Sequence, residues 1–269
     1  MRILVVGATG KVGRHVVAQL DGVEVCALVR SEVPLPAGVR AVRGDLTRPE
    51  TLDVSADAVF LMWPFDSADG VRDVLAALKG RVVYLSSAGV EVATDAINVV
   101  HAEVEREIER SGLDWTFLRA GGFAGGTLDW GEQIRAGDVV RDSFGSASRS
   151  LIHEADIAAV AVRALTEPGH EGVKYVLTGP ESLTQREQVR IIGEELGRPL
   201  RFVEIPREQV LKEMVDGGIP ERAAEEILSA YAAMGEASQP VYSTVEDVTG
   251  VPARTYREWV RDHLHEFAG

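Results

Sequence analysis

A run of glycines near the start of the chain has the spacing that binds a dinucleotide. Gly7, Gly10 and Gly13 directly follow the apolar run 3–6 and open a helix-like segment over 14–20. A pyrophosphate needs close backbone amides, which side chains at Gly7 and Gly10 would block, and it gains from the positive end of the helix dipole. The alternative is a tight strand-to-helix turn without a ligand. We predict a nucleotide site made by Gly7, Thr9, Gly10, Lys11, Val12 and Gly13.

The end of the second apolar run indicates which dinucleotide is bound. NAD-selective sites place a carboxylate there to accept from the ribose 2′-hydroxyl, whereas an arginine suits a 2′-phosphate. Here the run ends in Arg30 and Ser31, and the acidic Glu32 stands two residues beyond Arg30. The alternative is that Arg30 is a plain solvated residue. The charge at this position favours NADP(H).

A proton donor of the usual kind is missing from the sequence. The best-known short-chain dehydrogenases use a tyrosine four residues before a lysine, and here the residues four positions before the lysines are Gly7, Leu75, His170 and Glu208. If hydride is transferred, the cofactor supplies it and another group, or water, must supply the proton.

Two other side chains are candidates for that chemistry. Ser86 stands at the carboxyl end of a central apolar run, where ligands of open α/β sheets collect, so its hydroxyl is a candidate to bond the substrate oxygen or the nicotinamide. The alternative is that Ser86 bonds only the backbone of its own turn. His101 titrates in the range suited to proton donation, although a histidine at the surface or at a helix end is the alternative.

Aromatic residues are candidates for the wall of a substrate pocket. Phe123, Trp130 and Trp63 would suit a flat substrate, although core packing explains each of them individually. Metal and nucleophilic chemistry are disfavoured. His263 and His265 are two residues apart in an expected helix and so face different sides, and Ser86 follows a leucine rather than the glycine turn of a nucleophile elbow.

The elements that must position these residues alternate between strand-like and helix-like patterns. A helix is expected over about 98–110, ending before Gly112. Such alternation predicts a parallel sheet covered on both faces. The expected strands are 3–6, 23–29, 39–42, 58–62, 82–85 and 115–118.

The second half of the chain has a different character. Loops are expected over 120–126, which is glycine-rich, and over 137–150, which is polar. A strand over 174–177 precedes a capping box at Thr184, which opens a helix ending near residue 197. A last helix is expected over 255–267, with an apolar stripe that belongs to the core.

The composition limits the classes of function. The chain has 269 residues, is 45% hydrophobic and carries a net charge of −14, which disfavours binding to nucleic acid or to anionic membrane surfaces. The single cysteine, Cys26, lies in an apolar run and is expected to be a small buried side chain. With no signal peptide pattern and no long apolar run, the protein is expected to be cytoplasmic.

Short motifs occur over nearly the whole chain, at 7–13, 28–30, Gly44-Asp45-Leu46, Ser86-Ser87-Ala88-Gly89, 111–119, 153–158, 177–184 and 196–199. Together these segments resemble the atypical short-chain dehydrogenase/reductases of the NmrA-like type. The resemblance is specific for fold and cofactor rather than for substrate.

The resemblance implies further site residues. By it, Asp45 and Leu46 flank the adenine, while Trp63 and Pro64 line the ribose and nicotinamide side. His101 begins the helix that in related reductases carries a lysine or histidine facing the nicotinamide.

These observations predict a Rossmann-like, doubly wound parallel α/β fold with a small C-terminal α/β lobe. We expect residues 1–150 to form the NAD(P)-binding core and residues 151–269 a lobe packed on it as a single structural unit, in a monomer or homodimer. The resemblance implies an NADPH-dependent reductase of a small carbonyl, quinone or conjugated compound, with a flat or aromatic substrate. The alternative is a regulator that senses NADP(H) without turnover. Sugar-nucleotide epimerisation is a third reading, and it relies on the missing Tyr-Lys pair.

Overall fold

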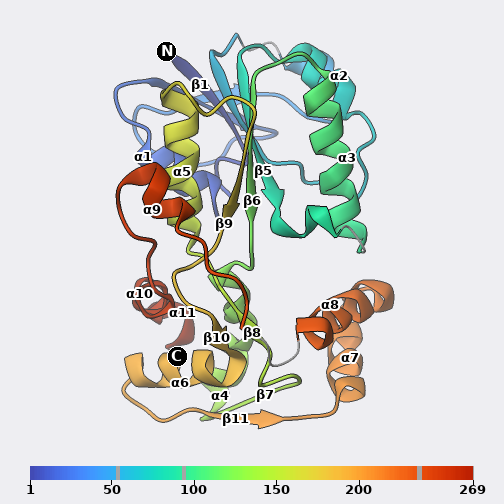
Figure 1. Ribbon diagram of the computed structural model, residues 1–269, viewed down its shortest axis with the longest axis vertical. Helices are drawn as coiled ribbons and strands as arrows, with labels where there is room; N and C mark the ends of the chain where they lie inside the picture. Colours follow the sequence, from blue (N-terminus) through green and yellow to red (C-terminus); the bar gives the residue numbers. More distant parts are fainter. Residues whose placement is uncertain (53–54, 93–94, 235–237, 269) are drawn as a thin grey trace. The chain divides into compact units, whose positions relative to one another are not determined.

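The chain divides into two compact units, each assembled from three separate stretches of sequence (Figure 1). The computed structural model describes residues 1–52, 55–92, 95–234 and 238–268. The first unit comprises Met1–Gly121, Glu154–Leu177 and Ser243–Pro252, and the second comprises Gly122–His153, Thr178–Tyr242 and Ala253–Gly269. The boundary predicted at residue 150 lies inside a stretch of the second unit.

A seven-stranded sheet forms the centre of the first unit, and all of its described pairings are parallel. Its spatial order, β3-β2-β1-β4-β5-β6-β9, reverses direction between β1 and β4, which creates the crevice where open α/β sheets bind ligands. The predicted doubly wound parallel sheet is therefore confirmed. The strands are β1 Arg2–Val6, β2 Glu24–Val29, β3 Arg40–Arg43, β4 Ala58–Leu61, β5 Arg81–Ser87, β6 Trp115–Ala120 and β9 Val173–Leu177.

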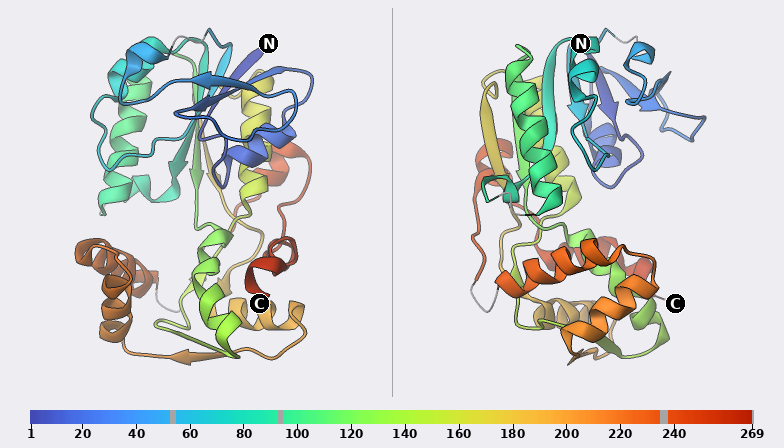
Figure 2. Two further views of the ribbon diagram at one scale, coloured as in Figure 1. Left: turned by 180° about the vertical axis from the view of Figure 1, so that it is seen from behind. Right: turned by 90° about the vertical axis from the view of Figure 1, so that its right-hand side faces the viewer.

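Helices cover both faces of this sheet, which explains why its strands are apolar along their length. In Figures 1 and 2, α1 (Gly13–Gln19) and α5 (Glu154–Thr166) lie on one face, while α2 (Val71–Ala77) and α3 (Ala96–Arg110) lie on the other. Val104 and Ile108 of α3 are fully buried against the sheet. Short segments complete the unit: η1 Pro49–Thr51, η2 Ala88–Glu91 and α9 Thr244–Thr249.

The second unit is built from short strands and helices around its own core. Its strands form two pairs, β7 with β11 in parallel and β8 with β10 antiparallel. Trp259, Tyr256, Ile134 and Phe267 are its largest fully buried side chains. Its elements are η3 Ala124–Trp130, α4 Gly131–Ala136, β7 Val139–Asp142, β8 Ser148–Arg149, β10 Leu183–Thr184, α6 Gln185–Glu195, β11 Arg201–Glu204, α7 Arg207–Asp216, α8 Glu221–Met234, α10 Tyr256–Asp262 and α11 Leu264–Phe267.

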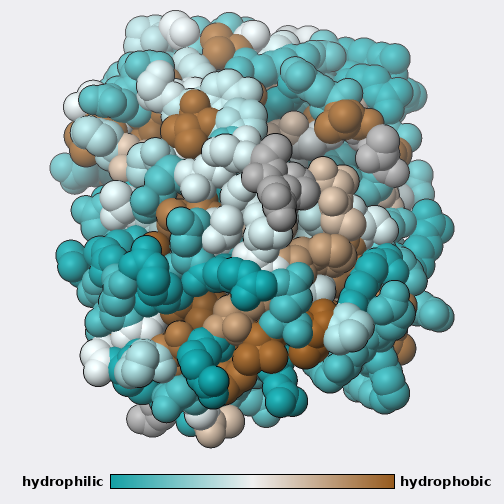
Figure 3. Space-filling view, turned by 60° about the horizontal axis from the view of Figure 1, so that its bottom comes forward, coloured by the Kyte–Doolittle hydropathy of each residue, from teal (hydrophilic) through white to brown (hydrophobic). Residues whose placement is uncertain are grey.

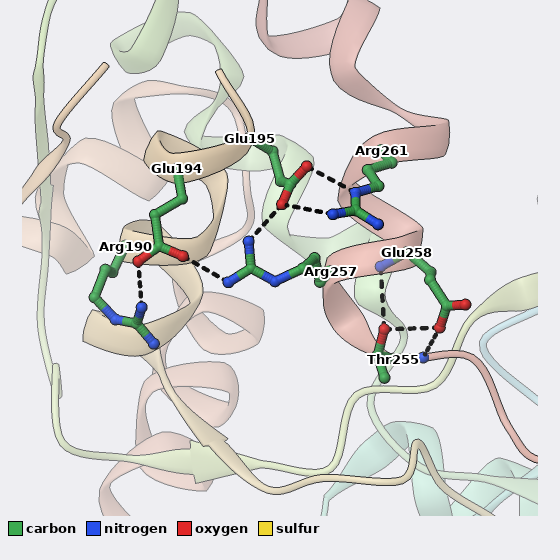
Figure 4. Close-up of polar contacts among 7 residues, drawn as sticks. All are labelled: Arg190, Glu194, Glu195, Thr255, Arg257, Glu258 and Arg261. Atoms are coloured by element: carbon green, nitrogen blue, oxygen red, sulfur yellow. Dashed lines mark hydrogen bonds and ion pairs between the residues drawn. The ribbon is translucent and has the colours of Figure 1, made fainter. Parts of the chain in front are cut away.

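Ion pairs join α6 to α10 at the surface of the second unit (Figure 4). Arg257 bonds both Glu194 and Glu195, and Arg261 Nε lies 2.8 Å from Glu195 Oε2. Ion pairs near the surface contribute little free energy, and Trp259 of α10 lies in the same buried hydrophobic cluster as Val189 and Ile192 of α6. The capping box predicted at Thr184 is present at the start of α6.

Two sequence expectations for the second unit were wrong. The predicted helix over 255–267 is two helices that meet at His263. In a continuous helix the His263 amide would donate to the carbonyl oxygen of Trp259, but here the His263 side chain occupies that oxygen, with Nδ1 at 2.8 Å. The predicted loop over 137–150 contains β7 and β8, whose partner strands β11 and β10 lie far along the sequence, so no local pattern announces them.

The face of the molecule drawn in Figure 3 is mostly hydrophilic, with separate hydrophobic patches. Among the described residues, no helix is long and apolar enough to span a bilayer.

Candidate functional site

The glycine loop after β1 is shaped by close backbone approach. Gly7 has φ +77°, a left-handed conformation that favours glycine, and a Cβ at this position would lie 2.8 Å from Met62 Cε. A Cβ at Gly13 would lie only 2.0 Å from the Gly7 carbonyl oxygen. The first turn of α1 therefore rests directly on the loop, so Gly7 and Gly13 are required by the fold itself.

Gly10 differs from these two glycines. A Cβ at Gly10 would meet only the Gly7 carbonyl oxygen, at 3.1 Å, and Thr9, Gly10 and Lys11 are exposed whereas Val12 is buried. The N-cap of α1 makes no side-chain hydrogen bond, and the amides of Arg14 and His15 donate to the carbonyl oxygens of Gly10 and Val12, so the preceding amides of the loop are the ones that would meet an anion. This cradle at the crevice between β1 and β4 fits the pyrophosphate of a dinucleotide.

Charged residues gather at the carboxyl ends of β2 and β3. Arg30, directly after β2, is exposed, and it lies close enough to Asp45 to help lower the pKa of that carboxyl, as does Arg48. The main cause of that lowering is the hydrogen bonds that Thr47 donates to Asp45 Oδ1, at 2.9 Å from its amide and 2.8 Å from its hydroxyl. The Asp45 carboxylate therefore holds its own turn, and the neighbouring Leu46 is buried.

Trp63 and Pro64 follow β4 at the same edge of the sheet. Trp63 is buried, its Nε1 donates to the Ser67 carbonyl oxygen at 2.7 Å, and its ring meets Phe65 edge to face. Pro64 is exposed. The predicted roles of Arg30, Asp45, Leu46, Trp63 and Pro64 toward a cofactor stay predictions.

A tyrosine and a histidine pair across β5 and α3. Tyr84 Oη lies 2.6 Å from His101 Nδ1. Tyr84 is fully buried, whereas His101 is half-buried, and its Nε2 has no hydrogen-bond partner among the described residues. Tyr84 therefore fixes the plane of the imidazole and leaves Nε2 as the ring nitrogen open to a ligand.

A buried ion pair lies next to this contact. Arg119 of β6 bonds both carboxylate oxygens of Glu105, at 3.0 Å from Nε and 2.7 Å from Nη2, and Ser86 Oγ donates to Glu105 Oε1 at 2.6 Å. The side chains of Arg119 and Glu105 are 8% and 4% exposed, and Ser86 is 4% exposed. The predicted catalytic role of Ser86 is untested, but the observed partner of its hydroxyl is a structural carboxylate.

The two contacts share a simple geometric origin. Tyr84 and Ser86 are two residues apart and so face the same side of β5, while His101 and Glu105 are four apart and so share one face of α3. In the strand register Ser86 is paired with Arg119, which brings the guanidinium beside the same carboxylate.

The surroundings keep Tyr84 and His101 neutral. Burial raises the pKa of the Tyr84 hydroxyl, and the Glu105 charge raises it further. Burial lowers the pKa of His101, an effect opposed by the nearby carboxylates of Glu105 and Asp95. At neutral pH the imidazole is therefore mostly uncharged.

Two of the three aromatic residues predicted to line a substrate pocket, Phe123 and Trp130, border one cavity within the second unit, and Trp63 does not. We call this space, of about 400 Å³, the second-unit cavity. Phe123 and Trp130 contribute to its wall, and Trp130 Nε1 donates to Asp142 Oδ2 at 2.8 Å. Its volume falls in the range of small-molecule sites.

The sequence patterns singled out neither Glu105 nor Asp142 as functional residues. One sequence signal would have identified Glu105. It is the four-residue spacing of His101 and Glu105 on one helix, combined with the two-residue spacing of Tyr84 and Ser86 in the strand before it. No sequence signal indicated Asp142, because a loop was expected over 137–150, where the structure has strand β7.

The similarities to known proteins agree with this geometry. The sequence matches the NmrA-like family over residues 1–267. It is 38% identical to the (4-alkanoyl-5-oxo-2,5-dihydrofuran-3-yl)methyl phosphate reductase of Streptomyces griseus, over 99% of each chain. It is 35% identical to the NAD(P)H azoreductase of Xenophilus azovorans, over 98% of this chain and 99% of that protein.

The fold matches solved structures over nearly their whole length. The NADPH-dependent quinone oxidoreductase of Escherichia coli, complexed with NADPH, has a TM-score of 0.81 at 22% identity and covers 98% of this chain, with 99% of its own chain matched. Triphenylmethane reductase of Citrobacter has a TM-score of 0.81 at 22% identity, over 98% of this chain and all of its own. The predicted fold is confirmed by these likenesses.

Variants of Gly10 and Gly13 distinguish a glycine needed for ligand binding from one needed for the fold. We expect Gly10→Val to abolish dinucleotide binding in a folded protein, since its side chain occupies the approach of the pyrophosphate but meets the protein only at 3.1 Å. Gly13→Ala is the contrasting variant, which should lower the melting temperature because its Cβ overlaps a backbone oxygen. NADPH titration by fluorescence with circular dichroism checks both, and retained binding in folded Gly10→Val would contradict the assignment.

Removing one partner of the Glu105–Arg119 pair should destabilise the first unit. We expect Arg119→Met to lower the free energy of unfolding by roughly 3 to 5 kcal/mol, because it leaves a buried carboxylate without its cation. Arg72→Met is the matched control: Arg72 also pairs with a glutamate, Glu107, but its side chain is 75% exposed, so the loss should stay below about 1 kcal/mol. Equal losses in urea denaturation would argue against the role of burial.

Proposed function

The chain belongs to the NmrA-like family, and from this premise we propose that it reduces a small, flat carbonyl, quinone or conjugated compound with NADPH. The observation that carries the proposal is the glycine loop before α1, which lies where the strand order reverses, together with Arg30 in place of an acid at the end of β2. The relatives from Streptomyces and Xenophilus are both reductases by name, which supports oxidoreductase chemistry.

Different residues of the first unit bind different parts of the cofactor. The amides of Lys11 and Val12 bind the pyrophosphate, for which Gly10 leaves room, and Arg30 binds the 2′-phosphate. Asp45 and Leu46 contact the adenine, and Trp63 with Pro64 lies on the nicotinamide side. When bound, NADPH supplies a hydride to the substrate.

The proton comes from a group other than the Tyr-Lys pair of typical short-chain dehydrogenases. We assign it to His101, whose Nε2 is open while Nδ1 is held by Tyr84 at 2.6 Å. Tyr84 is a positioning residue in this scheme. Ser86 is not assigned as the proton donor, because its hydroxyl proton is donated to Glu105.

Cofactor preference tests the role of Arg30. We expect NADPH to bind more tightly than NADH by roughly 1 to 3 kcal/mol, the range of a charge-assisted contact with the 2′-phosphate, and Arg30→Ala to remove most of that preference. Parallel fluorescence titrations measure it. Equal affinities in the parent protein, or an unchanged preference in Arg30→Ala, would contradict the proposal.

The pH dependence of turnover tests His101. If the imidazolium donates the proton, turnover is highest at low pH and falls as pH rises through a pKa below the ordinary 6.5, because burial disfavours the charged form more than Glu105 and Asp95 favour it. His101→Phe should lose roughly 100-fold or more in kcat.

Tyr84→Phe is the matched variant for the His101 test. It keeps the imidazole and removes its fixed partner, so it should lose less activity than His101→Phe and shift the pH profile. A His101→Phe enzyme with the parent rate and pH profile would transfer the role to Ser86 or water.

The proposal as a whole is tested by loss of NADPH absorbance against a panel of quinones, enones, azo compounds and aromatic ketones. Turnover of any of these classes supports the reductase. Tight NADPH binding without oxidation across the panel would instead favour a regulator that senses NADP(H).

A further inference from the structure

Three carboxylates and two guanidinium groups line the second-unit cavity. The carboxylates are those of Asp129, Asp142 and Glu213, of which the first and last are exposed. Asp142 is held in place by two donors, Trp130 Nε1 at 2.8 Å and the Ser143 amide at 2.7 Å. Its pKa is raised, because burial and the charges of Asp129 and Glu213 outweigh the lowering by these two hydrogen bonds, and both of the observed donors are uncharged.

Two arginines also line the cavity. Arg149 Nη1 donates to Tyr231 Oη, on the same wall, at 2.9 Å, and its guanidinium lies 5.2 Å from the centre of that ring. Arg141 is exposed. The donors observed at Asp142 are Trp130 and the Ser143 amide rather than either arginine.

A second, independent feature beside Asp142 points to a ligand. The Oγ of Ser143, a residue 3% exposed, is buried without a hydrogen-bond partner among the described residues, and Ser143 lines the same cavity. Burying a hydroxyl without a partner costs free energy, so such groups commonly mark a place where a bound molecule completes the bonding.

The backbone beside Ser143 is also held in an unusual conformation. Phe144, another wall residue, has φ +58°, the only positive φ of a non-glycine among the described residues. Gln185 Nε2 fixes this turn by donating to the carbonyl oxygens of Ser143, at 2.9 Å, and Phe144, at 3.1 Å. Strained backbone that is fixed in this way is typical of ligand-binding positions.

The remaining wall suits a flat, apolar body. Aromatic rings are contributed by Phe123, Trp130, Phe144 and Tyr231, and aliphatic side chains by Leu151 and Leu228. Rings of this kind stack on conjugated molecules and also favour a cationic group near their faces.

We propose that the second-unit cavity binds an aromatic or conjugated ligand that carries a cationic nitrogen, with the Asp142 carboxylate as its counter-ion and Ser143 Oγ as a further polar contact. This site goes beyond the proposed function, because every residue of its wall belongs to the second unit, whereas the residues assigned to the cofactor belong to the first.

Three probes that share one ring system test the charge preference. Isothermal titration calorimetry without NADPH compares 2-naphthylmethylammonium, 2-naphthylmethanol and 2-naphthoate at pH 7. We expect the cation to bind about tenfold more tightly than the neutral alcohol, the factor that one charge-assisted hydrogen bond gives, and the anion to bind most weakly. Because no turnover is needed, this result is independent of whether the protein proves to be a reductase.

Two variants assign the preference to Asp142. Asp142→Asn keeps an oxygen that accepts from Trp130 and should bind the cation and the alcohol equally, with the alcohol's affinity unchanged. Asp216→Asn, which removes an exposed carboxylate of α7 outside the cavity wall, should behave as the parent protein.

Several outcomes would overturn the proposal. These are equal affinity of the parent protein for cation and alcohol, tighter binding of naphthoate, or undiminished discrimination in folded Asp142→Asn. If Asp142→Asn fails to fold by circular dichroism, the comparison of the three probes on the parent protein still decides the charge preference.

Discussion

The buried pair between Glu105 and Arg119 joins three elements of the first unit at one point. Glu105 belongs to α3, Arg119 to β6, and Ser86, which donates to the same carboxylate, to β5. Both charges are almost completely removed from water, so their attraction and their hydrogen bonds must offset a large desolvation cost, which only a fixed geometry allows. The rotation of α3 about its axis is thereby set, and with it the position of His101 one turn earlier.

The contact of His101 with Tyr84 is a consequence of that rotation. Glu105 and His101 lie on the same face of α3, so Glu105 contacts Ser86 of β5 and His101 contacts Tyr84, two residues earlier in that strand. One carboxylate therefore affects the imidazole in two ways: it orients the helix, and its charge partly opposes the lowering of the pKa of His101 by burial. A structural ion pair and a candidate acid are in this way parts of one arrangement.

The two units use different physical means to prepare a binding surface. In the first unit the surface is backbone: a glycine loop in contact with the first turn of α1, where a Cβ at Gly13 would lie 2.0 Å from the Gly7 carbonyl oxygen. In the second unit it is made of side chains around a cavity, with a buried hydroxyl, a half-buried carboxylate and a strained turn held by Gln185. Backbone binding suits the constant pyrophosphate of a cofactor, whereas side chains suit a ligand that differs between relatives.

The sequence by itself determined the parts that depend on neighbours along the chain. The glycine spacing, the apolar strands and the capping box at Thr184 are local, so the parallel sheet, the loop after β1 and the family were predictable. Only the tertiary structure decided the pairs Tyr84–His101, Glu105–Arg119 and Asp142–Trp130, the break at His263, and the strands β7 and β8. Each of the three pairs joins residues 12 to 17 positions apart on different elements. The register between strands and the rotation of a helix, which no local pattern fixes, determine whether such side chains meet.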